Sequence, residues 1–346
     1  MRCTMRSRRT LGWWLLLFAL GQTVWSVVAE REPRLRDPSY GDKLAKLQRR
    51  CREHPARPLV LMLGSSRTGY ALDGLSAEDR LYAAHGTRAV VFNFGVPAAG
   101  PVTQLLYLRR LLNAGVTPDL LLIEVMPALL HDDGGKALER RFFAPERFSA
   151  GEAAFTANYG FDEAAATQAR LRSLVLPADR LRFPAVARVA PSWLPWQVRY
   201  DWSRGADACG WNRIQHPDVT DAQRARHTAA AKGEYGGTLA ALDLRGPASA
   251  ALGDAIALCK ARSIPVVVVL LPEGSAFRSW YAEAALRRLT EFCTATDTEL
   301  LDARVGLHDD DFADSHHMLP SGSAKFTRRL TDEVVAPKLR SAESAK

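Results

Sequence analysis

Two short polar segments of this sequence hold residue types that together can carry out nucleophilic catalysis. The first is Gly64-Ser65-Ser66-Arg67, in which serines directly follow a continuous apolar run. The second contains Asp314 and, three residues later, His317. An aspartate can orient a histidine of the same loop, and that histidine can accept the proton of a serine hydroxyl. If the fold brings Ser66, Asp314 and His317 together, they form a triad for attack on an acyl carbonyl.

Each segment also has a simpler interpretation. A serine between a strand and a helix often serves only as the helix N-cap. The second segment can be an ordinary polar surface loop, or a cation site, because carboxylates and imidazoles are common metal ligands. The candidate ligands are Asp309, Asp310, Asp311, Asp314, His316 and His317. Their spacing is irregular, so we predict no metal and no cofactor.

A third polar segment carries charged candidates for substrate binding. Glu273 and Arg278 follow the apolar run Ile264–Leu271, and both can contact a polar substrate. Arg67, next to the candidate nucleophile, is the third candidate of this kind. The alternative is a loop that ends in a helix cap at Ser279, and the sequence favours neither interpretation.

Apolar runs and helical patterns alternate along most of the chain, which predicts a parallel α/β sheet. Expected strands cover residues 59–63, 88–95, 119–125, 264–271 and 299–303. Expected helices cover residues 102–113, 248–261, 279–295 and 321–339. Ligands of such sheets bind beyond the carboxyl ends of the strands, so loops that follow strands are the places to search for a site.

One long segment, residues 128–247, interrupts this alternation. It contains Ala- and Arg-rich helical patterns and a Trp- and Pro-rich stretch from Pro191 to Trp202. We interpret it as an insertion, either a lid or a substrate-binding region. The expected organisation is therefore a leader over 1–29, a tether with a short helix over 30–58, and an α/β domain over 59–340 with this insertion.

The N-terminus carries an uncharged apolar segment, Leu11–Ala29, after several arginines. This pattern indicates a signal peptide or a signal anchor, and the segment is long enough to span a bilayer. Small residues at Val27–Ala29 also fit a cleavage site. The remaining chain is expected to be exported: anchored to the membrane facing the periplasm or the outside, or secreted if the leader is cleaved.

The charge composition and the cysteines indicate whether nucleic acid, zinc or disulfides are expected. The 346 residues include 46 basic and 38 acidic side chains, and four of the arginines precede the apolar segment. No basic stripe interleaved with aromatic residues is present, so a nucleic-acid partner is not expected. Four cysteines follow the apolar segment without CxxC spacing, which argues against a zinc site and leaves both disulfides and buried thiols open: Cys51, Cys209, Cys259 and Cys293.

The motifs and their order resemble the SGNH/GDSL hydrolase superfamily. Gly64-Ser65-Ser66 and the Asp314–His317 pair resemble its first and last sequence blocks, and Asn93–Gly100 resembles the second. The chain also resembles membrane-linked relatives, the DltD proteins of teichoic acid alanylation and the AlgJ/AlgX-type polysaccharide acetylation proteins. The resemblance implies a flavodoxin-like three-layer αβα fold, with Ser66 as nucleophile, His317 as general base and Asp314 as its orienting acid.

Two departures from the family pattern concern the oxyanion hole. Ala98 stands where the second block usually has a glycine, with Gly100 close by, and Glu124 and its neighbours replace the asparagine of the third block. We expect the backbone N–H of Ser66 and one near Gly100 to stabilise the oxyanion, and Asn93 can substitute for the missing asparagine, although Asn93 can also simply cap a turn. Losing one oxyanion donor can cost about 10²–10³ in rate, which puts the efficiency of a classical esterase in doubt.

These features predict serine-dependent acyl transfer on an ester, by an esterase or an O-acyltransferase that acts on an acylated cell-envelope glycan or glycolipid. A membrane-bound acyltransferase is a possible partner. The rival interpretation is a non-catalytic envelope protein that binds a glycan or such a partner. A metal-dependent phosphoesterase ranks last, because Gly64-Ser65-Ser66 lacks carboxylates and histidines.

Overall fold

The chain forms two compact units, seen in a computed structural model that describes residues 3–149, 151–195, 198–199, 201–215 and 217–344. The first unit comprises Met1–Asp42, Ala144–Ala157 and Asp162–Arg204. The second comprises Lys43–Phe143, Asn158–Phe161 and Gly205–Lys346, and it contains all three residues of the candidate triad.

A five-stranded parallel sheet forms the centre of the second unit. Its strands are β1 (Leu59–Gly64), β2 (Val90–Gly95), β3 (Leu120–Glu124), β4 (Val266–Leu270) and β5 (Glu299–Asp302). Their order is β2-β1-β3-β4-β5, with every neighbouring pair parallel. This is the flavodoxin-like order, in which the direction of winding reverses between β1 and β3. Ligands of such folds bind at that switch point, just beyond the ends of these two strands.

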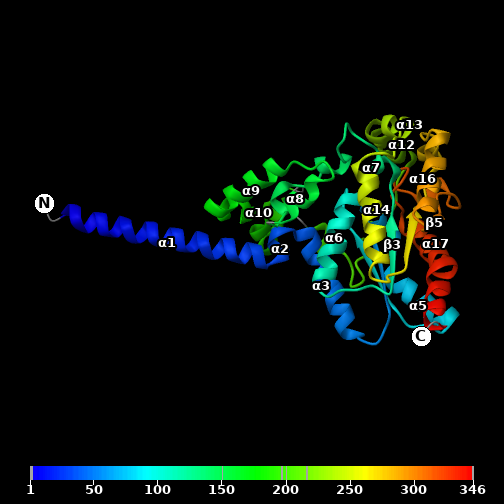
Figure 1. Cartoon of the computed structure of the whole chain (residues 1–346), viewed down its shortest axis with the longest axis horizontal. Coiled ribbons are helices and arrows are strands. Elements are labelled where there is room, and N and C mark those ends of the chain that lie inside the picture. The colour runs from blue at the N-terminus through cyan, green and yellow to red at the C-terminus, as the bar shows by residue number, and fades with distance from the viewer. Residues whose placement is uncertain (1–2, 150, 196–197, 200, 216, 345–346) are drawn as a thin grey trace. The chain divides into compact units, whose positions relative to one another are not determined.

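Helices cover both faces of this sheet, so the predicted three-layer α/β fold is confirmed. On one face, Val60, Met62 and Leu122 pack in a core with Leu81 and Phe326 from the helices. The helical elements on that side are α4 (Ser66–Ala71), α5 (Gly74–His85), α17 (Pro320–Leu330), η7 (Thr331–Val335) and α18 (Ala336–Ser344). The other face is covered by α6 (Pro101–Asn113) and α14 (Pro247–Lys260), which pack against each other (Figure 1).

Further short elements complete the second unit. They are α7 (Pro127–Leu130), η1 (Leu138–Arg141), α12 (Asp221–Ala231), η5 (Lys232–Gly236), α13 (Gly237–Ala240), α15 (Ser275–Arg278), α16 (Glu283–Ala295) and η6 (Asp309–Asp311). The helix expected over 279–295 begins only at Glu283. The four cysteines from Cys51 to Cys293 are free thiols.

The first unit is helical. Its elements are α1 (Cys3–Arg31), α2 (Pro33–Arg36), η2 (Pro145–Arg147), α8 (Glu152–Ala157), α9 (Glu163–Val175), α10 (Pro177–Val189), η3 (Pro191–Trp193) and the start of α11 (Trp202–Gly205). Within α1, Ser7–Val28 has the length and apolarity of a membrane span, which signal sequences also have. Met1 and Arg2 of the expected leader, and Trp196, Gln197 and Tyr200 of the Trp-rich stretch, lie outside the described residues.

The stretch expected to act as a tether, 30–58, contains a long helix, α3 (Pro38–Glu53), that extends into the second unit. Its Leu47 and Lys43 side chains are fully buried. The Lys43 ammonium donates to the backbone carbonyls of Asn93 and Gly210. Burial of this side chain lowers the pKa of Lys43 well below its usual value. The boundaries expected for leader, tether and insertion stay predictions.

Asn93 supports the backbone that follows β1. Its side-chain amide donates to the carbonyls of Thr68 at 2.7 Å and Leu72 at 2.8 Å, and its Oδ1 accepts from Gly95 N at 2.9 Å. The residue is fully buried, so no water can replace these bonds without a rearrangement. Asn93 therefore fixes α4, the helix that begins at Ser66.

We expect Asn93→Ala to lower the free energy of unfolding by about 2–4 kcal/mol, because it removes the side-chain partners of the Leu72 carbonyl and the Gly95 N–H and one of two donors to the Thr68 carbonyl. Urea unfolding measures this change. Asn113→Ala, at the exposed end of α6, is the matched control and should change stability by less than about 0.5 kcal/mol. Equal effects of the two substitutions would contradict the supporting role of Asn93.

Candidate active site

The structure brings Ser66, His317 and Asp314 into one hydrogen-bonded line. Ser66 is the first residue of α4, directly beyond β1, and its Oγ lies 2.9 Å from His317 Nε2. The other ring nitrogen, Nδ1, lies 2.7 Å from Asp314 Oδ2. The side chains of His317 and Asp314 are 24% and 14% exposed, so the line is open to solvent at the histidine. These are the distances that a serine nucleophile and its base require.

The loop before α17 holds Asp314 in place from its own backbone. Asp314 Oδ1 accepts the N–H groups of His316 and His317, both at 2.7 Å. Burial by itself raises the pKa of Asp314, but the two imidazoles and these hydrogen bonds outweigh it and hold the pKa well below its usual value. An ionised carboxylate can only accept, so the proton of the His317 ring lies on Nδ1 and Nε2 is left to accept from Ser66.

His316 has a different environment from its neighbour. Its ring packs at 5.2 Å from the Phe277 ring and at 5.7 Å from the Tyr235 ring. Burial and the adjacent His317 lower the pKa of His316 well below its usual value, although Asp314 acts in the opposite direction. His316 is therefore a neutral packing residue beside the candidate base.

A buried carboxylate, Glu124, fixes the turn that carries Ser66. It is the last residue of β3 and is fully buried. Its Oε2 accepts from Ser65 N at 2.6 Å and from Thr68 Oγ1 at 2.6 Å, and Ser65 Oγ donates to Oε1 at 2.9 Å. Sequence reasoning noted Glu124 only as the residue standing in place of an asparagine. The available signal was a carboxylate that ends an otherwise apolar strand, Leu-Leu-Leu-Ile-Glu.

The two residues expected to support an oxyanion are engaged elsewhere, which corrects that expectation. The Asn93 amide bonds to the backbone around α4, as described above. The Gly100 N–H donates to Glu139 Oε2 at 2.9 Å, and Glu139 also accepts from Val102 N at 2.7 Å and Thr103 N at 3.0 Å. Glu139 thus caps the start of α6 and occupies the Gly100 donor.

Two other backbone N–H groups near the β1 and β2 ends have no protein acceptor among the residues that the structure describes: those of Ser66 and Ala98. Ala98 follows Pro97 in a turn closed by Ala99 N to Val96 O, at 3.1 Å. Its φ of 57° lies in the left-handed region that favours glycine. The backbone at Ala98 therefore has the conformation that a glycine would adopt there.

Two of the three expected substrate-binding residues cannot reach a substrate. Arg67 is 1% exposed and Glu273 is 0% exposed, with 3.3 Å between Arg67 Nη2 and Glu273 Oε1. Tyr281 OH donates to the same carboxylate oxygen at 2.6 Å. A buried arginine needs such a partner, so this pair supports the site from inside. Arg278 is half-buried and donates to the carbonyls of Glu273 and Arg304; its role stays a prediction.

A cation is chemically possible at this loop. Ligand atoms of Asp314, His316 and His317 lie within 4.8 Å of one another. Asp314 Oδ2 and His317 Nδ1, which could serve as two such ligands, are already hydrogen-bonded to each other. A metal at these atoms would have to break the bond that orients His317, so the donor set suits proton transfer better than coordination.

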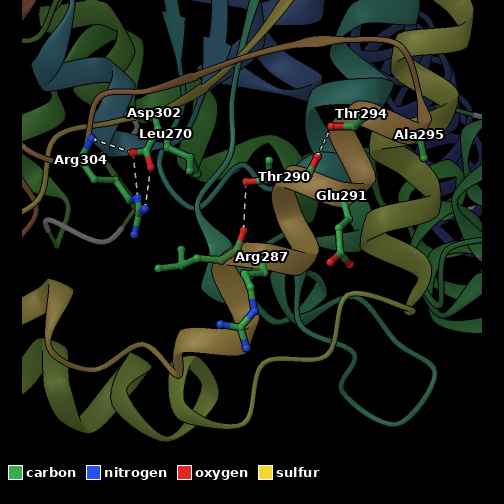
Figure 2. Close-up of a pocket in the computed structure, with 9 residues that line it drawn as sticks. Leu270, Arg287, Thr290, Glu291, Thr294, Ala295, Asp302 and Arg304 are labelled. Carbon is green, nitrogen blue, oxygen red and sulfur yellow. Dashed lines mark hydrogen bonds and ion pairs between the residues drawn. The ribbon is translucent and has the colours of Figure 1, made fainter.

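A separate pocket of about 650 Å³ lies along α16 and the ends of β4 and β5 (Figure 2). Neither Ser66 nor His317 lines it. Its hydroxyls belong to Thr290 and Thr294, which donate to helix carbonyls. The charged pair Asp302 and Arg304 at its edge is closed by a 2.6 Å contact. The pocket lacks an activated nucleophile, so the hydrogen-bonded line at Ser66 is the better candidate.

Comparisons with known proteins leave the family open. The profile of a family described as a protein of unknown function (DUF1574) matches residues 42–144. No curated protein matches the chain. Among solved structures, a mutant of the esterase AlinE4 is 14% identical, with 71% of this chain and 75% of the other covered and a TM-score of 0.29.

Replacing Glu124 should slow reactions at Ser66. In Glu124→Gln one of the two acceptor oxygens becomes an amide nitrogen, which donates rather than accepts, so part of the set of hydrogen bonds from Ser65 and Thr68 is lost and the turn shifts. We expect Ser66 to react about 10- to 100-fold more slowly with a fluorophosphonate. Glu299→Gln, an exposed carboxylate at the start of β5, is the control. An unchanged rate in folded Glu124→Gln would show that the carboxylate does not position the serine.

The free energy of unfolding should fall with rising pH because of the buried Glu139 side chain. Burial raises the pKa of Glu139 to about 7, against the hydrogen bonds from Thr103, Val102 and Gly100. The folded-state pKa then exceeds the unfolded-state value of about 4.3, so the folded state is penalised as pH rises from about 4.5 to 7. Relative to Glu139→Gln, the wild type should lose roughly 3 kcal/mol over that range. Denaturant unfolding at several pH values tests this, and a constant difference between the two proteins would refute it.

Proposed function

We propose that this protein is a serine-dependent acyl-transfer enzyme, an esterase or an O-acyltransferase. The observation that carries the proposal is the line from Ser66 through His317 to Asp314, with contacts of 2.9 and 2.7 Å. Its position beyond β1, at the switch point of the sheet, is where folds of this order bind their ligands.

In the proposed reaction, His317 Nε2 accepts the Ser66 proton as Oγ attacks the acyl carbonyl carbon. Asp314 stabilises the imidazolium that forms. The carbonyl π pair moves onto oxygen, and the backbone N–H groups of Ser66 and Ala98 are the proposed donors to that oxyanion. The intermediate then expels the leaving alkoxide, which takes the proton from His317. Water or a second hydroxyl, deprotonated by His317, then attacks the acyl-serine; the bond between the acyl carbon and Ser66 Oγ breaks, and His317 returns the proton to Oγ.

We further propose that the acyl donor or acceptor is a cell-envelope glycan or glycolipid, and that the protein remains attached to the membrane through α1. The apolar segment Ser7–Val28 supports this placement. A membrane-bound acyltransferase is the proposed partner when the protein acts as a transferase. The occupied N–H of Gly100 and the occupied Asn93 amide favour one alternative, a non-catalytic protein that binds the same glycans or partner.

Covalent labelling with a fluorophosphonate tests the proposal. Wild-type protein should be labelled, Ser66→Ala should not, and His317→Ala should react at least about 100-fold more slowly, because the general base is lost. Ser65→Ala is the matched control from the same turn. It should still be labelled, although more slowly than wild type, because it removes the hydrogen bond from Ser65 Oγ to Glu124 but leaves the Ser66 nucleophile in place.

Failure of folded wild-type protein to react would favour the non-catalytic alternative. To separate hydrolase from transferase, the protein is incubated with an acetyl ester in the presence and absence of a short oligosaccharide. Transfer to sugar hydroxyls, measured by mass spectrometry, identifies the transferase. Acetate release that is unaffected by the sugar identifies the esterase.

A further inference from the structure

Contacts inside the first unit show how α10 runs beside the apolar helix. Near the start of α10, Ala178 N donates to Gln22 Oε1 of α1 at 3.4 Å. Near its end, Arg188 donates to the carbonyl of Arg34 at 3.1 Å and pairs with Asp42 at 2.7 Å. The helix therefore starts beside the apolar segment of α1 and runs in the same direction, past the end of that segment.

These contacts give the depth at which α10 begins. The apolar segment Ser7–Val28 has 22 residues and is about 33 Å long as a helix, close to the thickness of a hydrocarbon core. Gln22 precedes Val28 by six residues, or about 9 Å. With α1 across a bilayer, the junction of α9 and α10 lies within the membrane boundary rather than in water.

The residue types at the α9–α10 junction are those found at the boundary of a membrane. Residues 174–178 read Leu-Val-Leu-Pro-Ala without a charge. The side chains of Leu171 and Leu176 are 57% and 50% exposed, although both are large and apolar. Arg172 precedes this run and is exposed. Asp179, Arg180 and Arg182 follow it, a flank with net positive charge in which Arg182 is exposed. An apolar tip with a basic collar is typical of segments that insert between lipid headgroups.

Gln22, the polar residue of α1 beside this junction, pairs with a backbone N–H at the start of α10. The first N–H groups of a helix have no partner inside the helix, and lipid offers none. Gln22, uncharged and half-buried, accepts the N–H of Ala178, the second residue of α10. The contact thus satisfies a donor that would otherwise be unpaired at membrane depth.

We infer that the α9–α10 junction, residues 171–178, is a second membrane contact that inserts into the boundary between headgroups and acyl chains beside α1. Its occupant is lipid: acyl chains around Leu171 and Leu176, and phosphate groups near Arg172 and Arg182. The inference concerns a lipid surface and is independent of any chemistry at Ser66. It requires that α1 stays attached, because cleavage after Ala29 removes Gln22.

The test uses the full-length chain in vesicles of phosphatidylcholine and phosphatidylglycerol. Leu176→Cys is labelled with the fluorophore NBD in a background in which Cys3 and Cys51 are replaced by serine; the other three cysteines are buried. Ser192→Cys, exposed beyond the far end of α10, is the matched control. Leu171→Cys gives a second probe of the junction if Leu176→Cys does not fold.

We expect nitroxide lipids to quench the probe at residue 176 at least about threefold more than the probe at residue 192, and aqueous iodide to show the reverse order. Equal iodide quenching at both sites in the intact chain would overturn the inference. Protection of residue 176 from both quenchers would also overturn it, because the junction would then be covered by protein, either a partner or a second copy. Loss of α1 from the mature protein would overturn it as well.

Discussion

The candidate site depends on one buried carboxylate at the end of a parallel strand. Glu124 lies on β3, next to β1, and accepts hydrogen bonds from Ser65 and Thr68 on either side of Ser66 in the chain. A carboxylate without water must be hydrogen-bonded, so the turn after β1 can adopt few other conformations. The same turn is held from the opposite side by Asn93 at β2. Two neighbouring strands thus fix the position from which the Ser66 hydroxyl extends.

The partner loop is fixed by a different principle, local hydrogen bonding within one short segment. Asp314 accepts hydrogen bonds from two backbone N–H groups of its own loop and from the Nδ1–H of the His317 ring. The orientation of its carboxylate is therefore set before any substrate binds. The same loop is tied to the segment after β4 through Gly274 N and Ser315 O, at 2.8 Å. The hydrogen bond between Ser66 and His317 joins the two halves of the line, and the Tyr70 ring of α4 packs edge-on against the His317 ring. Such preorganisation is what electrostatic catalysis requires, because the dipoles do not have to reorient during the reaction.

Buried charges elsewhere in the second unit have structural roles. Arg67 and Glu273 lie close to the candidate site in sequence or in topology, yet they neutralise each other out of contact with solvent. Lys43 binds backbone carbonyls of Asn93 and Gly210, and so attaches α3 to the sheet. Removing one member of the Arg67–Glu273 pair would leave an uncompensated charge in the interior, which costs more than the pair contributes when intact.

The sequence by itself determined the sheet, the loops that follow its strands, and the pairing of Asp314 with His317, because apolar periodicity and short-range spacing are local properties. It could also suggest Ser66 as the nucleophile, since a hydroxyl residue that follows a buried strand can be recognised from the sequence alone. Only the tertiary structure decided the strand order, the contact between Ser66 and His317, and the fate of charged residues such as Arg67, Glu273 and Gly100's partner Glu139. These depend on which atoms fill a neighbour's hydrogen-bonding capacity and on burial, and residues far apart in the chain set both.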